Sequence, residues 1–317
     1  MKYYIGIDLG GTNIAAGVVT EEKYLMAKHS VPTLAWRSFE DIVADMVSLT
    51  LTVIENSGLE QKDISCVGIG VPSSIHPVTG NVVFANNLNW VDKPLISEFQ
   101  KHISLPVFLG NDADCAALGE AFAGSARDYD NVLMLTLGTG VGGGLIMNKK
   151  LFSGGTKLGF EPGHICLVYN GLPCTCGQRG CFEVYASCTG LIRQTIEAIA
   201  QYPTTEMKKL CDNNFDKVSA RTAFDAARLG DMAALQVVDT YTSYVAAGAA
   251  SLINVLRPDV LIIGGGLSNE GDYLLKPLNK KIKAFIYASD IVAPPNAIRA
   301  TLGNDAGIIG ATLLGEE

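Results

Sequence analysis

The sequence has little positive charge and few features of an exported or membrane protein. Its 24 Lys and Arg residues are outnumbered by 32 Asp and Glu residues, so it offers no basic surface for a nucleic-acid backbone. Glycines and charges interrupt every apolar run before the roughly 20 residues that a bilayer-spanning helix needs. The first residues lead directly into an expected strand, without the apolar segment of a signal peptide. We therefore expect a cytoplasmic protein that binds neither nucleic acid nor membrane.

Two common nucleotide-binding signatures are also missing. No G-x-x-x-x-G-K-[ST] sequence occurs, which excludes a P-loop. Residues 138–143 formally match G-x-G-x-x-G, but the apolar strand residues Leu145 and Ile146 follow them where a dinucleotide-binding fold has a helix. Any ATP must therefore be held in another way.

The elements that are present predict two α/β lobes. A chain of 317 residues can bury two separate cores. Strands are expected at 3–9, 14–19, 24–31, 65–71, 105–109, 132–135, 145–147 and 260–263, and helices at 38–56, 113–123, 232–256 and 306–314. The strand, glycine turn and strand at the start recur about 130 residues later, which indicates duplicated lobes. We expect an N-terminal lobe of residues 1–120, joined by the C-terminal segment 303–317, and a C-terminal lobe of residues 121–302.

Three glycine turns follow expected strands, at 10–12, 138–140 and 264–266. Their missing side chains would let backbone N–H groups approach phosphate oxygens, although an ordinary hairpin turn explains the first one equally well. Asp8 stands two residues before the first turn. Its carboxylate could hold a hydrated Mg²⁺ ion or simply stabilise the turn.

Four potential metal ligands fall within eighteen residues: His164, Cys174, Cys176 and Cys181. Three thiolates and one imidazole make a closed tetrahedral set that suits Zn²⁺, whereas the other cysteines are scattered as buried thiols usually are. Unconnected thiols in a glycine-rich loop are the alternative. Because four protein ligands leave no position for water, we expect a structural zinc that orders the loop carrying Glu161 and Glu183.

Asp112 lies at the junction between an expected strand and an expected helix. A carboxylate there could act as a general base toward an alcohol during phosphoryl transfer. It could equally cap the helix N-terminus, a role open to Asn111 and Asp114 as well. The local sequence leaves both readings open.

Taken in order, these motifs resemble the ROK family (repressors, open reading frames and sugar kinases). The resemblance covers the whole chain and rests on residues 8–12, 110–113, 137–142, the cysteine loop and residues 264–266. It implies the two-lobed hexokinase and actin-like ATPase (ribonuclease H-like) fold with duplicated mixed sheets. It also implies a homodimer that uses ATP and Mg²⁺ to phosphorylate a hexose, with glucose as the first choice.

The resemblance assigns roles to individual residues. Asp112 is implied to be the general base. The implied sugar contacts are Asn87, Asn111, Glu161, His164 and Glu183. The implied ATP and Mg²⁺ contacts are Asp8, Gly10, Gly11, Thr12, Asn13, Gly138, Thr139, Gly140, Gly265 and Gly266.

Departures from the family pattern leave the hexose open. Pro162 stands where an aliphatic residue is usual and Ser73 where glycine is frequent, and both fall near the implied sugar site. Fructose, mannose, allose and N-acetylhexosamines remain alternative acceptors. A sugar-sensing repressor is less favoured, because the strand from Tyr3 leaves no room for an N-terminal helix-turn-helix and the chain is acidic. A chaperone or filament ATPase would not need Glu161 and Glu183.

Overall fold

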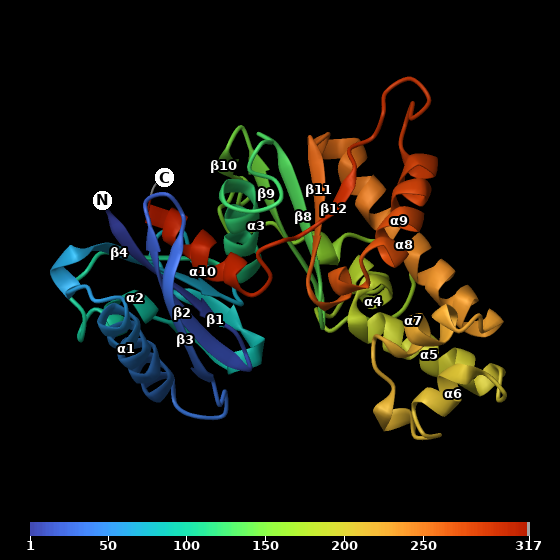
Figure 1. The fold of residues 1–317 in the computed structure, drawn as a ribbon, viewed down its shortest axis with the longest axis horizontal. Helices are drawn as coiled ribbons and strands as arrows, with labels where there is room; N and C mark the ends of the chain where they lie inside the picture. Colours follow the sequence, from blue (N-terminus) through green and yellow to red (C-terminus); the bar gives the residue numbers. More distant parts are fainter. Residues whose placement is uncertain (316–317) are drawn as a thin grey trace. The chain divides into compact units, whose positions relative to one another are not determined.

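The computed structural model describes residues 1–315, which form two compact units (Figure 1). Unit 1 comprises residues 1–133, 144–160 and the segment from residue 300 onward, and unit 2 comprises residues 134–143 and 161–299. Unit 1 thus includes residues 121–133 and 144–160, which the sequence-based division assigns to the second lobe. Residues 316 and 317, the end of the predicted C-terminal segment, lie outside the described residues.

Two mixed sheets share one strand order, β3-β2-β1-β4-β7 in the first and β10-β9-β8-β11-β12 in the second. In the first sheet β2 runs antiparallel to β1, whereas β4 and β7 run parallel to it. Each sheet therefore has a glycine-turn hairpin, β1–β2 or β8–β9, at the same place, and the duplicated mixed sheets are confirmed. The strands are β1 Tyr3–Leu9, β2 Asn13–Thr20, β3 Leu25–Pro32, β4 Ile64–Val71, β5 Val82–Ala85, β6 Trp90–Lys93, β7 Val107–Asn111, β8 Val132–Leu137, β9 Val141–Met147, β10 Lys150–Leu151, β11 Val260–Gly264 and β12 Ala297–Arg299.

The helices begin and end largely where their capping residues place them. Ser38 caps α1 by accepting a hydrogen bond from the Asp41 N–H, and Asp231 caps α8 through the Ala234 N–H. Among the described residues no helix has the length and apolar character to span a bilayer. The helices are α1 Phe39–Asn56, α2 Leu95–Phe99, α3 Asp112–Phe122, α4 Phe182–Ala186, α5 Cys188–Gln201, α6 Glu206–Leu210, α7 Thr222–Arg228, α8 Met232–Leu256, α9 Asp272–Phe285 and α10 Asp305–Ala311.

The side chains of strand β1 point alternately to the two faces of the first sheet. Ile5, Ile7 and Leu9 are fully buried in the core that also contains the apolar face of α1. Because side chains alternate along a strand, Gly6 and Asp8 face the opposite side, where α10 lies. The strand therefore delivers Asp8 to the α10 face of the sheet.

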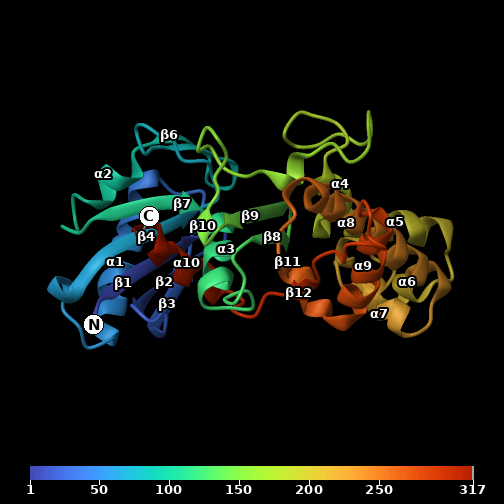
Figure 2. The same cartoon turned by 90° about the horizontal axis from the view of Figure 1, so that it is seen from above.

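A row of glycines lets α10 lie directly on that face. Gly17, Gly6 and Gly68 are neighbours across β2, β1 and β4. A Cβ atom on Gly6 would stand 1.9 Å from the Ile308 carbonyl oxygen, and one on Gly68 would stand 1.8 Å from that of Ala311. Only glycine permits this approach, which carries α10 up to Asp8. Figures 1 and 2 both show α10 beside α3, and the two helices pack closely together.

Candidate active site

Asp8 is the last residue but one of β1 and is half-buried. Burial, and secondarily the charge of Asp112, raises the pKa of the Asp8 carboxyl to about 6. A Cβ atom added to Gly307 of α10 would lie 2.7 Å from the Asp8 Oδ2, so this glycine leaves the carboxylate its space. Such a shifted, partly desolvated carboxylate is typical of a functional site.

Asp112 is the first residue of α3, directly after β7. The N-cap is its neighbour Asn111, whose Oδ1 accepts from the N–H groups of Ala113 at 2.9 Å and Asp114 at 3.3 Å. The Asp112 Oδ1 also accepts from the Ala113 N–H, at 2.8 Å. Asn111 and Asp112 therefore both accept hydrogen bonds at the N-terminus of α3. The helix dipole there favours the ionised form of the Asp112 carboxyl.

The strand register explains why Asp8 and Asp112 interact. Asp8 pairs with Gly70 of β4, and Gly70 pairs with Gly110 of β7. A Cβ atom on Gly70 would lie 3.6 Å from the Asp112 Cα, so a larger side chain would crowd the space between the two acids. The parallel strands β1, β4 and β7 thus bring two carboxylates to one edge of the sheet.

The first glycine turn joins this group. The Gly10 N–H donates to the Asn13 carbonyl, and the hydroxyl of the fully buried Thr33 donates to the Gly10 carbonyl at 2.6 Å. A Cβ atom on Gly11 would meet that of Asn87 at 3.0 Å, so Asn87 borders the turn. Unit 1 therefore gathers Asp8, the first turn and Asn87. Thr33 was not predicted, because it stands outside every motif.

Unit 2 brings the other two glycine turns together. Gly265 has a φ of +75°, and a Cβ atom on it would lie 2.5 Å from the Leu137 carbonyl oxygen at the end of β8. Two α5 residues contact the second turn: the Cys188 N–H donates to the Gly138 carbonyl and the Thr189 hydroxyl donates to the Thr139 carbonyl, each at 2.8 Å. The N-terminus of α5 therefore lies beside the turn. Sequence reasoning missed this contact, although Ser187 before a periodic segment is a typical N-cap signal.

The predicted cysteine cluster is assembled in unit 2. The ligand atoms of His164, Cys174, Cys176 and Cys181 all lie within 4.8 Å of one another. The Cys176 and Cys181 sulfurs are 3.6 Å apart, and the Cys174 sulfur is 3.8 Å from the His164 Nδ1. Ligands of a tetrahedral zinc ion, at about 2.3 Å for sulfur and 2.0 Å for nitrogen, stand about 3.6 to 3.8 Å apart. These four residues therefore fit a zinc ion.

Glu183 links the cysteine cluster to the second glycine turn. Its Oε2 accepts from the Val141 N–H at 2.9 Å, and its Oε1 lies 3.9 Å from the Cys174 sulfur. Glu161 stands on the same loop, two residues before Gly163. Partial burial raises the pKa of the Glu161 carboxyl, His164 opposes the rise and Glu183 adds to it. Because Nδ1 of His164 faces the sulfurs, its Nε2 is the ring nitrogen left for a substrate.

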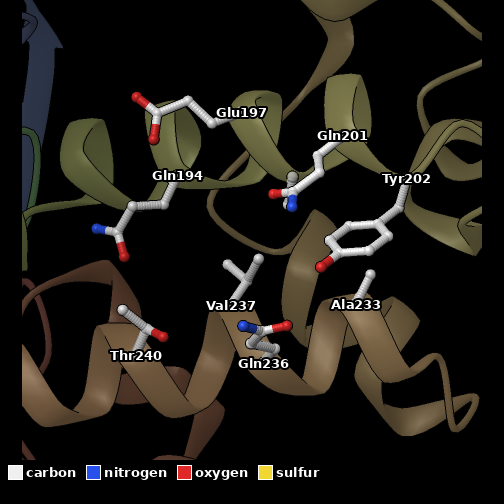
Figure 3. A pocket seen from close by; sticks show the side chains of 9 residues that line it. Gln194, Glu197, Gln201, Tyr202, Ala233, Gln236, Val237 and Thr240 are labelled. Carbon is white, nitrogen blue, oxygen red and sulfur yellow. The ribbon is translucent and has the colours of Figure 1, made fainter.

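A groove of about 240 Å³ runs between α5 and α8 in unit 2 (Figure 3). Gln194, Gln201, Gln236 and Thr240 contribute polar groups to its lining, and Ala198, Ala233 and Val237 contribute apolar ones. None of the candidate residues lines it. It is therefore separate from the groups described above.

Comparison with known proteins identifies the class. Residues 4–317 match the model of the ROK family, and the chain belongs to this family. It is 37% identical to the glucokinase of Thermotoga maritima, over 99% of this chain and 97% of that protein. It is 36% identical to the glucokinase of Halalkalibacterium halodurans, over 98% of this chain and 93% of that protein.

A solved structure gives the same result. The ROK family glucokinase from Streptomyces griseus, crystallised with glucose and AMPPNP, superposes with a TM-score of 0.84 at 34% identity, and the match covers 98% of each chain. The family and the two-lobed sugar-kinase fold expected from the motifs are thus confirmed.

Proposed function

We propose that the protein is an ATP-dependent kinase that phosphorylates a hexose hydroxyl, with glucose as its preferred acceptor and glucose 6-phosphate as the product. The observation that carries this proposal is the pair of interacting carboxylates, Asp8 and Asp112, at the edge of the first sheet. The similarity to glucokinases over nearly the whole chain supports the reaction, and the glucose and AMPPNP bound to the Streptomyces griseus enzyme support the two substrates.

Asp112 is the proposed general base. Phosphoryl transfer needs the accepting hydroxyl aligned with the γ-phosphate and relieved of its proton, and an ionised carboxylate at a helix N-terminus can take that proton. Asn111, whose oxygen already caps α3, retains its amide nitrogen as a donor for a sugar oxygen. Asn87 offers a further amide group beside the first turn.

Asp8 and the glycine turns are proposed to serve the nucleotide. Mg²⁺, when bound, neutralises phosphate charge and would be held by Asp8 through its water shell. Gly11, Thr12 and Asn13 in one turn offer donors to phosphate oxygens, and Thr139, Gly140, Gly265 and Gly266 offer donors in the others. Gly10 and Gly138, whose N–H groups close the two turns, contribute space for the phosphates to approach. Because these donors are backbone groups fixed by hydrogen bonds, they need little reorganisation during the reaction.

We further propose that the cysteine cluster holds a structural zinc ion, since its ligand spacing suits tetrahedral coordination. The ion would fix the loop that carries Glu161, His164 and Glu183, which we propose as contacts to sugar hydroxyls. A homodimer in the cytoplasm, where ATP is available, is proposed on the family resemblance. Light scattering of the purified protein tests the dimer.

The decisive experiment measures ADP release with MgATP across glucose, mannose, fructose, allose and N-acetylated hexosamines. We expect the highest kcat/KM with glucose. Pro162, buried against Gly143, and Ser73, whose hydroxyl binds the backbone of Ser74 and Phe84, are the positions where a different preference would originate. The absence of turnover with every hexose would refute the kinase assignment.

A variant pair tests the base. Asp112→Asn should lower kcat by about 10²-fold or more, because the amide cannot accept the proton. Asp114→Asn, which changes a buried acid two residues further along α3, should keep kcat within about tenfold of the wild type. Equal losses in both variants would mean that the helix terminus, and not Asp112 in particular, supports turnover.

A further inference from the structure

Glu120 is a fully buried carboxylate to which the proposed chemistry gives no role. It lies in the last turn of α3, the helix that begins with Asp112, and its side chain is 0% exposed. A buried carboxylate is costly unless hydrogen bonds stabilise it. Glu120 therefore needs a structural or functional explanation.

Five hydrogen bonds stabilise the Glu120 carboxylate. Its Oε1 accepts from the N–H groups of Thr301 at 2.8 Å and Leu302 at 2.7 Å. Its Oε2 accepts from the N–H of Ser125 at 2.8 Å and from the hydroxyls of Ser125 and Thr301 at 2.9 and 3.3 Å. Gly124 makes room, because a Cβ atom there would lie 2.1 Å from the Glu120 Oε2.

The donors come from two segments that lead to different crossings, the points where the chain passes between the units. Ser125 lies on the segment that runs from α3 into β8, in which the chain leaves unit 1 after Leu133. Thr301 and Leu302 follow directly after the chain returns to unit 1 at Ala300. One side chain thus ties two otherwise separate crossings to the same helix.

The second of these segments continues into α10, which touches the acids of the candidate site. Leu302 precedes α10 by three residues, and Gly307 of α10 borders the Asp8 carboxylate. The helix also approaches α3 at the backbone level, since a Cβ atom on Gly310 would lie 1.6 Å from the Cys115 carbonyl oxygen. Because α3 and α10 pack so tightly, a shift of the segment at Thr301 would disturb the packing of the two helices.

We propose that Glu120 is a positioning residue for phosphoryl transfer: it fixes two chain crossings to α3 and thereby holds Asp112 and Asp8 in their working arrangement. This inference rests on the proposed kinase function. It predicts that Glu120 acts on turnover through these acids without touching substrate.

The donor set explains why a carboxylate is needed. Three of the five donors are backbone N–H groups, which cannot turn round to accept a hydrogen bond. In Glu120→Gln the single amide oxygen can accept hydrogen bonds either from Ser125 or from Thr301 and Leu302, and the NH₂ group faces the N–H groups of the other segment. That segment therefore loses its hydrogen bonds to α3, although the volume of the side chain is kept.

The experiment compares Glu120→Gln with a matched carboxylate in unit 2. Asp231 accepts from the Thr205 hydroxyl at 2.9 Å and from the N–H groups of Glu206 and Ala234 at 2.7 and 2.8 Å, but it lies far along the chain from every crossing. Asp231→Asn therefore replaces one acceptor oxygen of a hydrogen-bonded carboxylate, as Glu120→Gln does, without releasing a crossing. Turnover, sugar affinity by calorimetry and thermal unfolding are measured for both variants and the wild type, at a temperature where each is fully folded.

We expect Glu120→Gln to lower kcat about tenfold or more while the sugar Kd changes less than about threefold, because the substrate contacts remain and the acids are displaced. Asp231→Asn should keep wild-type kcat even if its melting temperature falls as far. Hydrogen exchange should show faster exchange at Ser125, or at Thr301 and Leu302, in Glu120→Gln alone.

The two hypotheses fail in different ways. A wild type without hexose-dependent ADP release overturns the kinase function itself. An active wild type whose Glu120→Gln variant keeps its kcat, or loses no more than Asp231→Asn, overturns the positioning role. If Glu120→Gln does not fold, Gly124→Ala decides the question, since a Cβ atom there would stand 2.1 Å from the Glu120 Oε2 and must displace the carboxylate from its donors; unchanged kcat in that variant contradicts the proposal.

Discussion

The two glycine-turn hairpins occupy the same place in two sheets of identical strand order, but they are held in different ways. In the first, the Gly10 N–H donates to the Asn13 carbonyl at 2.9 Å. The hydroxyl of Thr33, the residue directly after β3, donates to the Gly10 carbonyl. In the second, the Gly138 N–H donates to the Gly140 carbonyl at 3.0 Å. Its supports, Glu183 and Thr189, come from far along the chain.

The hairpins also differ in charge. Asp8 stands two residues before the first turn, and Thr136 occupies the corresponding place in β8. The first hairpin therefore carries a buried carboxylate whose pKa burial raises to about 6. The carboxylate that contacts the second turn belongs to Glu183 in the short helix α4, two residues after Cys181 of the cysteine cluster.

The difference shows how a duplicated scaffold divides its work. The first hairpin has its charge built into the strand. The second has neutral residues, and the carboxylate that contacts it belongs to a segment that the proposed zinc ion would order. Removing that ion should therefore disturb the second turn and spare the first.

The largest effect is expected from Cys176→Ser. Losing one thiolate should release the proposed zinc ion, which metal analysis of the purified protein measures, and activity should be abolished with it because the segment that carries Glu183 loosens. Cys166→Ser is the matched control, since this exposed cysteine lies in the same loop outside the cluster. Full activity in a metal-free Cys176→Ser protein would contradict the dependence of the second turn on the loop.

Asp8→Asn tests whether the charge of the first hairpin contributes to turnover in a way that the second hairpin does not. Removing the charge that we propose to hold the hydrated Mg²⁺ ion should lower kcat by about 10²-fold, since preorganised electrostatic groups typically contribute that much to transition-state stabilisation. Thr136→Ala, at the corresponding place in β8, should stay within a few-fold of the wild type. If steady-state kinetics show equal losses in the two variants, the hairpins are not divided in this way.

The sequence predicted the elements whose signals are local. The span of α8, Met232–Leu256, was predicted, because a long apolar face marks it in the sequence. The cysteine cluster was predicted because metal geometry imposes its own spacing. The short strands β5, β6, β10 and β12 were not predicted, since two to four residues give no periodicity to read.

Contacts between distant segments were beyond sequence reasoning. Nothing local relates Glu120 to Thr301, which is 181 residues away, or the hydroxyl of Thr33 to the first turn. The row of Gly17, Gly6 and Gly68 becomes meaningful only when strand register aligns it beneath α10. The residue types of the site could be predicted, whereas the groups that support them required the tertiary structure.

The pH dependence of stability tests whether the Asp8 carboxyl of the first hairpin has a raised pKa. Since the folded-state pKa of Asp8 is raised from 3.8 to about 6, the folded state binds this proton more tightly than the unfolded state does, and the free energy of unfolding falls as pH rises through that window. Urea unfolding of the ligand-free protein should therefore show Asp8→Asn gaining on the wild type between pH 4 and 7, by at most about 3 kcal/mol. The gain should be fully lost at the acid end, where the wild-type carboxyl is also neutral. A difference between the two proteins that does not vary with pH would mean that Asp8 titrates normally.

The smallest effect is expected from crowding the second turn. A Cβ atom on Gly140 would lie 2.3 Å from the Glu183 Oε2, so Gly140→Ala must displace that carboxylate and weaken its bond to the Val141 N–H. Overpacking of this kind costs about 1 kcal/mol, equivalent to roughly a fivefold loss in kcat/KM for ATP. Gly155→Ala is the control, because a Cβ atom there meets nothing within 4 Å. If Gly140→Ala keeps its kcat/KM while Glu183→Gln does not, Glu183 serves the sugar directly and its contact with the turn is incidental.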